Sequence, residues 1–313
     1  MTSTILVVGA TGNTGRNVVN TLPSLLANSK AQSSYRILAL TCSKSSAVAQ
    51  KFAKIPGVEV EEQTWTEITE EWLRERNVTR VFIASHNEPS HFADEGQFLT
   101  NALRAGVKYV VRISTTAANV TADCPAYYPR SYWAIEEMLS APEFKKMHWT
   151  SLQPNVFQST VIGPAVALVK HFKGTGKQDT LRLMLNDTTP TGVVDADDVG
   201  TLAAHLLAEE DTAAYNQKKL VINGPDITGE YVTQLVGKKI GEKVRDVRYQ
   251  NLDFLDDMAA QSNSPNLVRS IKHAPVTSWE GKAKSETTSK EVLELAAPRG
   301  TIEAMFEKML ADA

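Results

Sequence analysis

The first half of the chain alternates short apolar runs with longer segments in which apolar residues recur every three or four positions. Runs of the first kind predict buried strands, and segments of the second kind predict amphipathic helices. The predicted strands are residues 4–10, 35–41, 58–63, 79–85, 108–115 and 148–155. The predicted helices are residues 14–29, 45–55, 66–77, 94–107 and 130–141. This order is typical of a parallel sheet covered by helices on both faces.

The pattern is less regular in the second half of the chain. Residues 195–210 predict a helix with acidic residues in its first turn, 218–224 a strand and 227–241 a helix, and the chain beyond residue 250 is polar and helical in pattern. No linker is long enough to separate two independent domains. We therefore predict an α/β fold: a Rossmann-like doubly wound parallel sheet over residues 1–155, with a smaller, mostly helical substrate-binding region over 156–313. Within that region, residues 191–224 are expected to return to the Rossmann sheet.

Composition and charge narrow the classes of partner. The 313 residues carry 33 basic and 36 acidic side chains, a net charge of −3, which does not support a nucleic-acid or acidic-membrane partner. No apolar run reaches the ~18 residues of a membrane span, and no secretory signal precedes the first strand, so we expect a cytoplasmic protein. The two cysteines, Cys42 and Cys124, form no CxxC motif, and the histidines lack metal-ligand spacing. We expect no metal.

The segment ILVVGATGNTGRNVV, residues 5–19, contains the clearest motif. Gly9, Gly12 and Gly15 fit a GxxGxxG pattern in which the first glycine permits a tight turn, the second lets a pyrophosphate approach and the third lets helix and strand pack closely. The free N–H groups and positive dipole end of the following helix would face the phosphates. Because the motif lies between a predicted strand and a predicted helix, it predicts a dinucleotide site. A tight turn without a ligand is the alternative.

The end of the second predicted strand bears on which dinucleotide binds. NAD sites usually have an acidic residue there that binds the ribose 2′-hydroxyl. Residues 39–44 contain no acid, whereas Cys42, Ser43 and Lys44 stand at that position and Arg16 lies on the first helix. The missing carboxylate favours NADP(H), with Ser43, Lys44, Ser45 and Arg16 as candidate 2′-phosphate ligands. Lys44 is equally compatible with an ordinary solvated lysine.

Together with the glycine loop, the segments GVKYVVRIST, HWTSLQPNVF and VVDADDVGTLAAHLL occur in an order and spacing that resemble the NmrA-like family of atypical short-chain dehydrogenase/reductases. The resemblance covers residues 4 to 245. It implies a Rossmann fold, a preference for NADP(H) and a C-terminal substrate region. Members of the family include reductases of quinones, dyes and alkaloid-type imines, and also regulators that bind the nucleotide.

The resemblance also implies a role for individual residues. The pyrophosphate would lie on Gly9, Ala10, Thr11, Gly12, Asn13 and Thr14, ahead of Gly15 and Arg16. Thr64 and Trp65 would lie beside the adenine, and Ala84, Ser85 and His86 under the adenine-side ribose. Pro154, Asn155, Val156 and Phe157 would line the nicotinamide side. One departure from the family pattern is Gln153, where an arginine usually precedes the proline.

The catalytic pattern also departs from that of typical short-chain dehydrogenases, in which a Tyr-xxx-Lys pair handles the proton. Tyr132 stands where many relatives carry lysine, and Tyr128 precedes it by four residues. Hydride transfer itself belongs to the cofactor, so the departure does not forbid it. Tyr132, Tyr128 and Ser114, which follows the fifth strand, are the catalytic candidates. The alternative for Tyr132 is packing in the core, and for Ser114 an ordinary strand-end hydroxyl.

Two functions remain open from the sequence. The first is an NADP(H)-dependent oxidoreductase that acts on a small, fairly apolar carbonyl, quinone or imine. The second is a nucleotide-sensing regulator whose binding to a protein partner changes with NADP(H) occupancy. The sequence does not predict an oligomeric state. Two further patterns carry no site: residues 173–178 lack the spacing of a phosphate loop, and the acidic residues at 195–198 are explained by a helix N-terminal cap.

Overall fold

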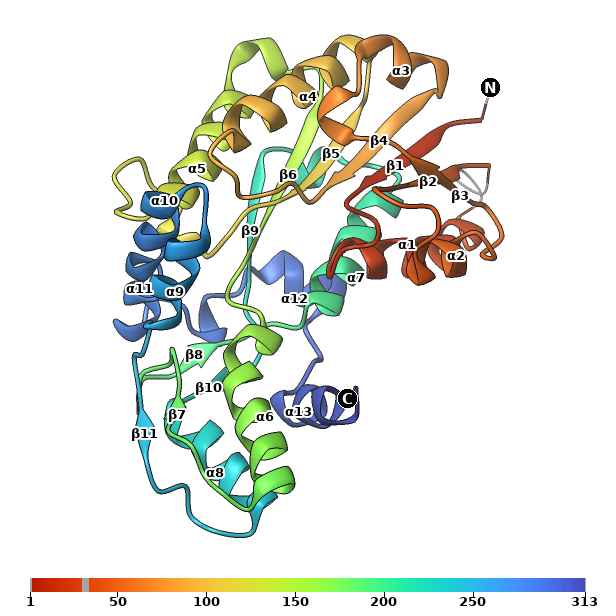
Figure 1. The fold of residues 1–313 in the computed structure, drawn as a ribbon. Coiled ribbons are helices and arrows are strands. Elements are labelled where there is room, and N and C mark those ends of the chain that lie inside the picture. The colour runs from red at the N-terminus through yellow and green to blue at the C-terminus, as the bar shows by residue number, and fades with distance from the viewer. Residues whose placement is uncertain (1, 30–33, 313) are drawn as a thin grey trace.

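A computed structural model describes residues 2–29 and 34–312 of the chain (Figure 1). Its centre is a seven-stranded sheet, in the order β3-β2-β1-β4-β5-β6-β9, whose strands all run parallel. This is the Rossmann order with one further strand added at the β6 edge. The strands are β1 (Thr4–Val8), β2 (Arg36–Thr41), β3 (Val58–Glu62), β4 (Val78–Ile83), β5 (Tyr109–Ile113), β6 (His148–Pro154) and β9 (Lys218–Ile222). The predicted fold class is confirmed.

Both faces of the sheet are buried, which is why its inner strands are continuous apolar runs. In β1, Ile5 and Val7 belong to one core and Leu6 and Val8 to another. The first core lies under the helices α1 (Gly15–Ala27), α2 (Ala47–Phe52), α7 (Ala196–Ala208) and α12 (Lys290–Ala296). The second lies under α3 (Glu70–Glu75), α4 (His91–Ala105) and α5 (Tyr127–Ser140).

Helix ends follow the signals in the sequence at two places. Gly106 ends α4 in a left-handed conformation with φ of +88°, which glycine adopts without strain. Asp195 caps α7 by accepting a hydrogen bond from the backbone N–H of Asp197, so the acidic residues there act as a cap. The helices α4 and α5 each begin three residues earlier than the periodicity predicts, at His91 and Tyr127.

The C-terminal region forms its own core below the sheet in Figure 1. The helices and strands of the C-terminal region are α6 (Gln158–Thr175), β7 (Leu181–Arg182), β8 (Thr191–Gly192), β10 (Asp226–Ile227), α8 (Gly229–Ile240), β11 (Val247–Arg248), α9 (Phe254–Gln261), α10 (Pro265–Ser270), α11 (Val276–Trp279) and α13 (Ile302–Ala311). The helix α6 was not predicted. Residues 173–175 are its last residues, and Gly176 closes the helix at φ +69°.

Short 3₁₀ helices complete the connections: η1 (Trp65–Glu67), η2 (Ala117–Asn119), η3 (Pro142–Phe144), η4 (Ala213–Tyr215), η5 (Ile271–His273) and η6 (Ser285–Thr287). The helices α9, α10 and α11 lie together at one side of the molecule, between the sheet and the C-terminal core (Figure 1). Residues near the carboxyl ends of β1, β4, β5 and β6 share a cavity with these helices. Ligands of open parallel sheets bind at this edge.

Candidate cofactor and substrate site

The glycine loop has the geometry that its three glycines predict. Gly9 adopts φ of +76°, and a side chain there would also press on the backbone oxygen of Ala84. A Cβ atom at Gly15 would lie 2.2 Å from the Gly9 carbonyl oxygen, so only glycine lets α1 pack this closely against the turn. At Gly12 the nearest atom to a Cβ is the same oxygen at 3.2 Å. The protein itself therefore leaves nearly enough room for a side chain at Gly12, and this room belongs to the cavity.

A cavity of about 590 Å³ extends from this loop into the C-terminal region. This volume lies within the usual range for small-molecule sites. The predicted site residues on its wall are Gly9, Gly12, Asn13, Thr14, Gly15, Ala84, Ser85, Ser114, Tyr128, Tyr132, Pro154, Asn155, Val156 and Phe157. The structure thus brings together the glycine loop, the predicted nicotinamide side and all three catalytic candidates.

The remaining predicted cofactor residues do not line this cavity; they are Ala10, Thr11, Arg16, Cys42, Ser43, Lys44, Thr64, Trp65 and His86. Most of them follow β2, β3 or β4 at the same sheet edge. Arg16 donates a hydrogen bond to the side chain of Asn13, 3.2 Å away, which keeps its guanidinium beside the glycine loop. The residues after β2, β3 and β4 are those expected at the adenine end of the site, whereas Ala10 and Thr11 belong to the expected pyrophosphate loop.

An acidic side chain lies beside Lys44. Glu62, the last residue of β3, is paired in register with Thr41 of β2, and its carboxylate accepts a hydrogen bond of 2.8 Å from the backbone N–H of Lys44. The ammonium group of Lys44 is exposed and makes no ion pair with any described residue. A carboxylate of the neighbouring strand therefore lies close to the position at which β2 itself has no acid. This proximity depends on the register of β2 and β3, which neither segment shows alone.

Two of the predicted site residues, Ser85 and His86, already have side-chain hydrogen bonds with other groups of the protein. Both ring nitrogens of His86 are within hydrogen-bond distance of protein groups, the Asp94 carboxylate at 3.1 Å and the backbone N–H of Glu88 at 3.2 Å. The hydroxyl of Ser85 donates to Glu95 at 2.6 Å. The ring of Trp65 lies 5.4 Å from that of His86, as an aromatic wall beside the loop after β4.

Asn155 holds three parts of the cavity wall together. Its amide oxygen accepts a hydrogen bond from Thr116, after β5, and its amide nitrogen donates to the carbonyl oxygen of Gly192 in β8 at 2.6 Å. Because the side chain is spent on these bonds, Asn155 contributes to the site by positioning the ends of β5, β6 and β8.

The three catalytic candidates differ in the hydrogen bonds of their hydroxyl groups, and Ser114 is the least engaged. Its side chain is 4% exposed, and its Oγ has no hydrogen-bond partner among the described residues. Tyr132 donates its hydroxyl hydrogen to the side chain of Asn87 at 2.7 Å. Burial raises the pKa of Tyr132, and the nearby charge of Glu95 raises it further. Burial also raises the pKa of Tyr128, against a hydrogen bond with Thr115 that lowers it. Both phenols therefore stay protonated at neutral pH.

A buried network of the side chains of Glu95, Arg112 and His91 lies next to the ring of Tyr132. Burial by itself would raise the pKa of the Glu95 carboxyl, but Arg112 and His91 outweigh it and lower that pKa to about 2. The guanidinium of Arg112 donates to Glu95 at 2.6 Å and lies 5.3 Å from the ring of Tyr132, and the ring of His91 packs edge-on against that ring at 4.6 Å. The network fixes the ring of Tyr132 by packing and charge.

Glu136, on α5, is a second buried carboxylate in this network. It accepts hydrogen bonds from Ser151 at 2.7 Å and from Gln153, and Lys219 lies 3.3 Å away. Gln153 donates through its amide nitrogen to both carboxylate oxygens of Glu136. In this chain it satisfies a buried carboxylate from β6.

The family model described as the NmrA-like family matches residues 1–293. The chain belongs to the NmrA-like family. No curated protein sequence matches it. Among solved structures, this NmrA-like chain is similar to an NADPH-dependent quinone oxidoreductase, QOR2, from Escherichia coli complexed with NADPH, with 21% identity, a TM-score of 0.71, and 97% of this chain and 99% of that chain covered.

Two further structural relatives differ in what they do. Triphenylmethane reductase of a Citrobacter species, complexed with NADP(H), is 18% identical with a TM-score of 0.69, over 98% of this chain and 100% of that chain. The negative transcriptional regulator NmrA, in complex with NAD, is 13% identical with a TM-score of 0.72, over 99% of this chain and 95% of that chain. At these identities the likeness establishes the fold, while the function has to come from the site.

The C-terminal region was expected to bind the substrate of this NmrA-like site, but the sequence did not indicate which of its residues form the C-terminal wall of the cavity. Apart from polar Thr160, Thr191 and Ser278 it is mostly apolar, formed by Met184, Leu185, Phe254, Leu255, Met258, Leu267, Ile271, Ala274, Pro275 and Trp279. Asn119 ties this wall to the sheet edge by donating to the carbonyl oxygen of Ala274 at 3.0 Å. Phe254 and Met258 are about half exposed and mark the cavity's open side.

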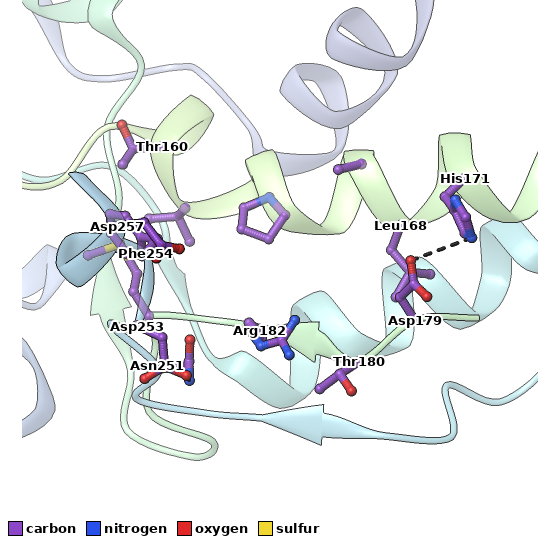
Figure 2. A pocket seen from close by; sticks show the side chains of 14 residues that line it. Thr160, Leu168, His171, Asp179, Thr180, Arg182, Asn251, Asp253, Phe254 and Asp257 are labelled. Carbon is purple, nitrogen blue, oxygen red and sulfur yellow. Dashed lines mark hydrogen bonds and ion pairs between the residues drawn. The ribbon is translucent and has the colours of Figure 1, made fainter. Parts of the chain in front are cut away.

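A second hollow of about 810 Å³ adjoins the first, along α6, β7 and the start of α9 (Figure 2). The two hollows share Thr160, Met184 and Phe254. The outer one is more polar, with Arg182 in its middle and an ion pair of 3.5 Å between His171 and Asp179 at one end (Figure 2). The apolar cavity therefore opens past Phe254 towards a polar groove.

Within the described ranges no helix has the length and apolar character to cross a membrane.

Proposed function

We propose that the chain is an NADP(H)-dependent oxidoreductase that transfers a hydride to a small, fairly apolar carbonyl, quinone or imine. One observation carries the proposal: the glycine loop, the buried unpaired hydroxyl of Ser114 and the apolar C-terminal wall line a single cavity. A protein that only binds the nucleotide requires no more than the glycine loop. A reductase also requires an apolar space at the far end and a hydrogen-bond donor between the two.

The residues present fit the nucleotide. The bare side of Gly12 and the N-terminus of α1 suit a pyrophosphate, and α1 has no acidic residue in its first turn to oppose it. The nicotinamide, when bound, supplies the hydride. Val156 and Phe157 follow β6 on the wall of the same cavity, where they suit the flat nicotinamide ring.

The chain's own contribution to the chemistry would be hydrogen bonding to the developing negative charge on the substrate. Ser114 offers an unpaired hydroxyl, and Asn87 offers an amide nitrogen, since the amide oxygen of Asn87 is occupied by Tyr132. Preorganised donors of this kind stabilise an oxyanion without giving up the proton. Tyr128 and Tyr132 remain candidates for the donor, with phenols that stay protonated at neutral pH.

The second candidate function is a sensor that binds NADP(H) without turnover. It is favoured by the absence of a lysine beside the tyrosines and by the hydrogen bond that already occupies the hydroxyl of Tyr132. In typical short-chain dehydrogenases the lysine lowers the tyrosine pKa, whereas burial here raises it.

The deciding experiment measures substrate-dependent NADPH oxidation over a panel of quinones, aldehydes, ketones and cyclic imines. We expect turnover with at least one class, and at least one of Ser114→Ala, Tyr128→Phe and Tyr132→Phe should lower that rate by ~10²-fold while NADPH affinity stays nearly unchanged. Tyr127→Phe is the matched control, because Tyr127 lies on the same helix but is 44% exposed. Tight NADPH binding with no turnover, and no effect of any variant, would favour the sensor.

A further inference from the structure

Thr191 of β8 carries a buried hydroxyl that the fold does not use. The residue is 1% exposed, lies on the wall of the 590 Å³ cavity, and its Oγ1 has no hydrogen-bond partner among the described residues. A buried polar group without a partner destabilises the fold. Such a group in an otherwise well-packed protein requires an explanation, and a ligand in the adjoining cavity is one.

The polar groups around Thr191 are committed elsewhere. The indole N–H of Trp279 donates to the carbonyl oxygen of Met184 at 2.8 Å. The backbone N–H of Gly192 donates to Ala283, and its carbonyl oxygen accepts from Asn155. On this side the cavity wall is otherwise formed by apolar side chains, among them Met184, Leu185 and Trp279. The Thr191 hydroxyl is thus a buried, unpaired polar group within a mostly apolar part of the cavity wall.

Asn155 relates this hydroxyl to Ser114. Its amide binds Thr116, two residues after Ser114, on one side and Gly192, the neighbour of Thr191, on the other. Asn155 therefore joins the two segments that carry the unpaired hydroxyls, the end of β5 and the strand β8. Each hydroxyl has a free donor and a free acceptor, so each suits a carbonyl or hydroxyl oxygen.

We propose that Thr191 is a specificity-determining residue that binds a second oxygen of the substrate, remote from the reacting carbonyl bound at Ser114. This inference rests on the proposed oxidoreductase function and narrows its substrate to apolar ring compounds with two separated oxygens, such as quinones and hydroxylated aryl ketones. A buried, unpaired hydroxyl in a mostly apolar wall discriminates well, because a ligand that lacks the matching group leaves the hydroxyl unpaired.

The test is a calorimetric titration of the NADP⁺-saturated protein with 1-tetralone and with 6-hydroxy-1-tetralone, two bicyclic ketones that differ by one remote hydroxyl. We expect the wild type to bind the hydroxylated ketone ~10-fold more tightly. Thr191→Val, which keeps the shape and removes the hydroxyl, should bind the two ketones equally. Thr191→Ser should restore much of the preference. Thr188→Val, at an exposed threonine outside the cavity, should keep the wild-type ratio.

Thermal unfolding of Thr191→Val without ligand gives a second measurement. Because the hydroxyl has no partner in the fold, its removal should leave the melting temperature unchanged or raise it, whereas a structural hydroxyl would lower it. An equal ketone ratio in the wild type and Thr191→Val, or binding of neither ketone, would overturn the role of Thr191. Since these titrations measure affinity, they are separate from the turnover panel, and turnover with no effect of Thr191→Val would overturn this inference alone.

Discussion

Two glycines of the nucleotide loop should respond in opposite ways to the same substitution. A Cβ at Gly15 would lie 2.2 Å from the carbonyl oxygen of Gly9, 2.8 Å from its carbonyl carbon and 3.0 Å from the Cα of Ala10. All three are backbone atoms, so relief requires the turn and α1 to separate. At Gly12 the only atom within 4 Å is the Gly9 oxygen at 3.2 Å, which a shift of a few tenths of an ångström relieves.

Gly15→Ala should therefore destabilise the fold, whereas Gly12→Ala should not. Overpacking against fixed backbone costs about 1–3 kcal/mol, and we expect a loss at or above the upper end for Gly15→Ala. Gly12→Ala should change stability by less than about 0.5 kcal/mol, the range of substitutions without a named defect. Its new methyl group would instead occupy space that the pyrophosphate needs, so NADPH affinity should fall by ~10²-fold, equivalent to about 2.7 kcal/mol.

Urea unfolding and calorimetric titration with NADPH measure the two effects separately. Gly12→Val extends the series: the fold should stay intact while nucleotide binding becomes undetectable. If Gly12→Val still binds NADPH with wild-type affinity, the loop is purely structural and the cofactor proposal fails at its first step. A Gly12→Ala protein as unstable as Gly15→Ala would also refute the reasoning, because the two sites would then be equivalent.

The sheet could be predicted from the sequence because its physical signals are local. Buried parallel strands appear as short apolar runs, and the helices between them carry caps and glycine ends such as Asp195 and Gly106. The helix α6 was missed although its buried residues, from Gln158 to Val169, recur every three or four positions on one face. The contrary signal is Pro164, which lies inside this helix and is ordinarily a helix breaker.

The C-terminal wall of the site could not be predicted in the same way. Phe254, Ile271 and Trp279 meet Tyr128 and Ser114 only through tertiary packing, and no spacing in the sequence records that meeting. One signal was available and unused: Arg112 and Glu136 are charged residues within otherwise apolar, core-facing segments. A charge there must find a buried partner, and Arg112 finds Glu95, which supports Tyr132.

Further predictions concern the adenine end and the buried charges. Because β2 ends without an acid, NADPH should bind at least ~10-fold more tightly than NADH in calorimetric titrations. Lys44→Ala should narrow that ratio and Glu62→Gln should widen it, and an NADH preference would contradict the 2′-phosphate assignment. Because the Glu95 pKa falls from 4.5 to about 2 on folding, its contribution is present above pH 4.5 and lost as pH drops towards 2. Glu95→Gln should therefore lower the free energy of unfolding at pH 7 by on the order of 3 kcal/mol in urea unfolding. It should also reduce the loss of stability between pH 4.5 and pH 2. If the variant loses stability over this range as the wild type does, Glu95 is not the cause of that loss.

The missing lysine bears on which acceptors suit this site. Where a typical short-chain dehydrogenase protonates the product through a tyrosine of lowered pKa, this cavity holds phenols of raised pKa and the hydroxyl of Ser114, groups that donate hydrogen bonds but give up protons poorly. Hydride addition to a simple ketone leaves a strongly basic alkoxide that needs a proton at once. Hydride addition to a quinone leaves an aromatic phenolate that hydrogen bonds can hold until water protonates it. Within the proposed oxidoreductase function, the chemistry of the donors thus favours quinones over simple ketones, and a quinone is also the acceptor whose second oxygen would meet Thr191.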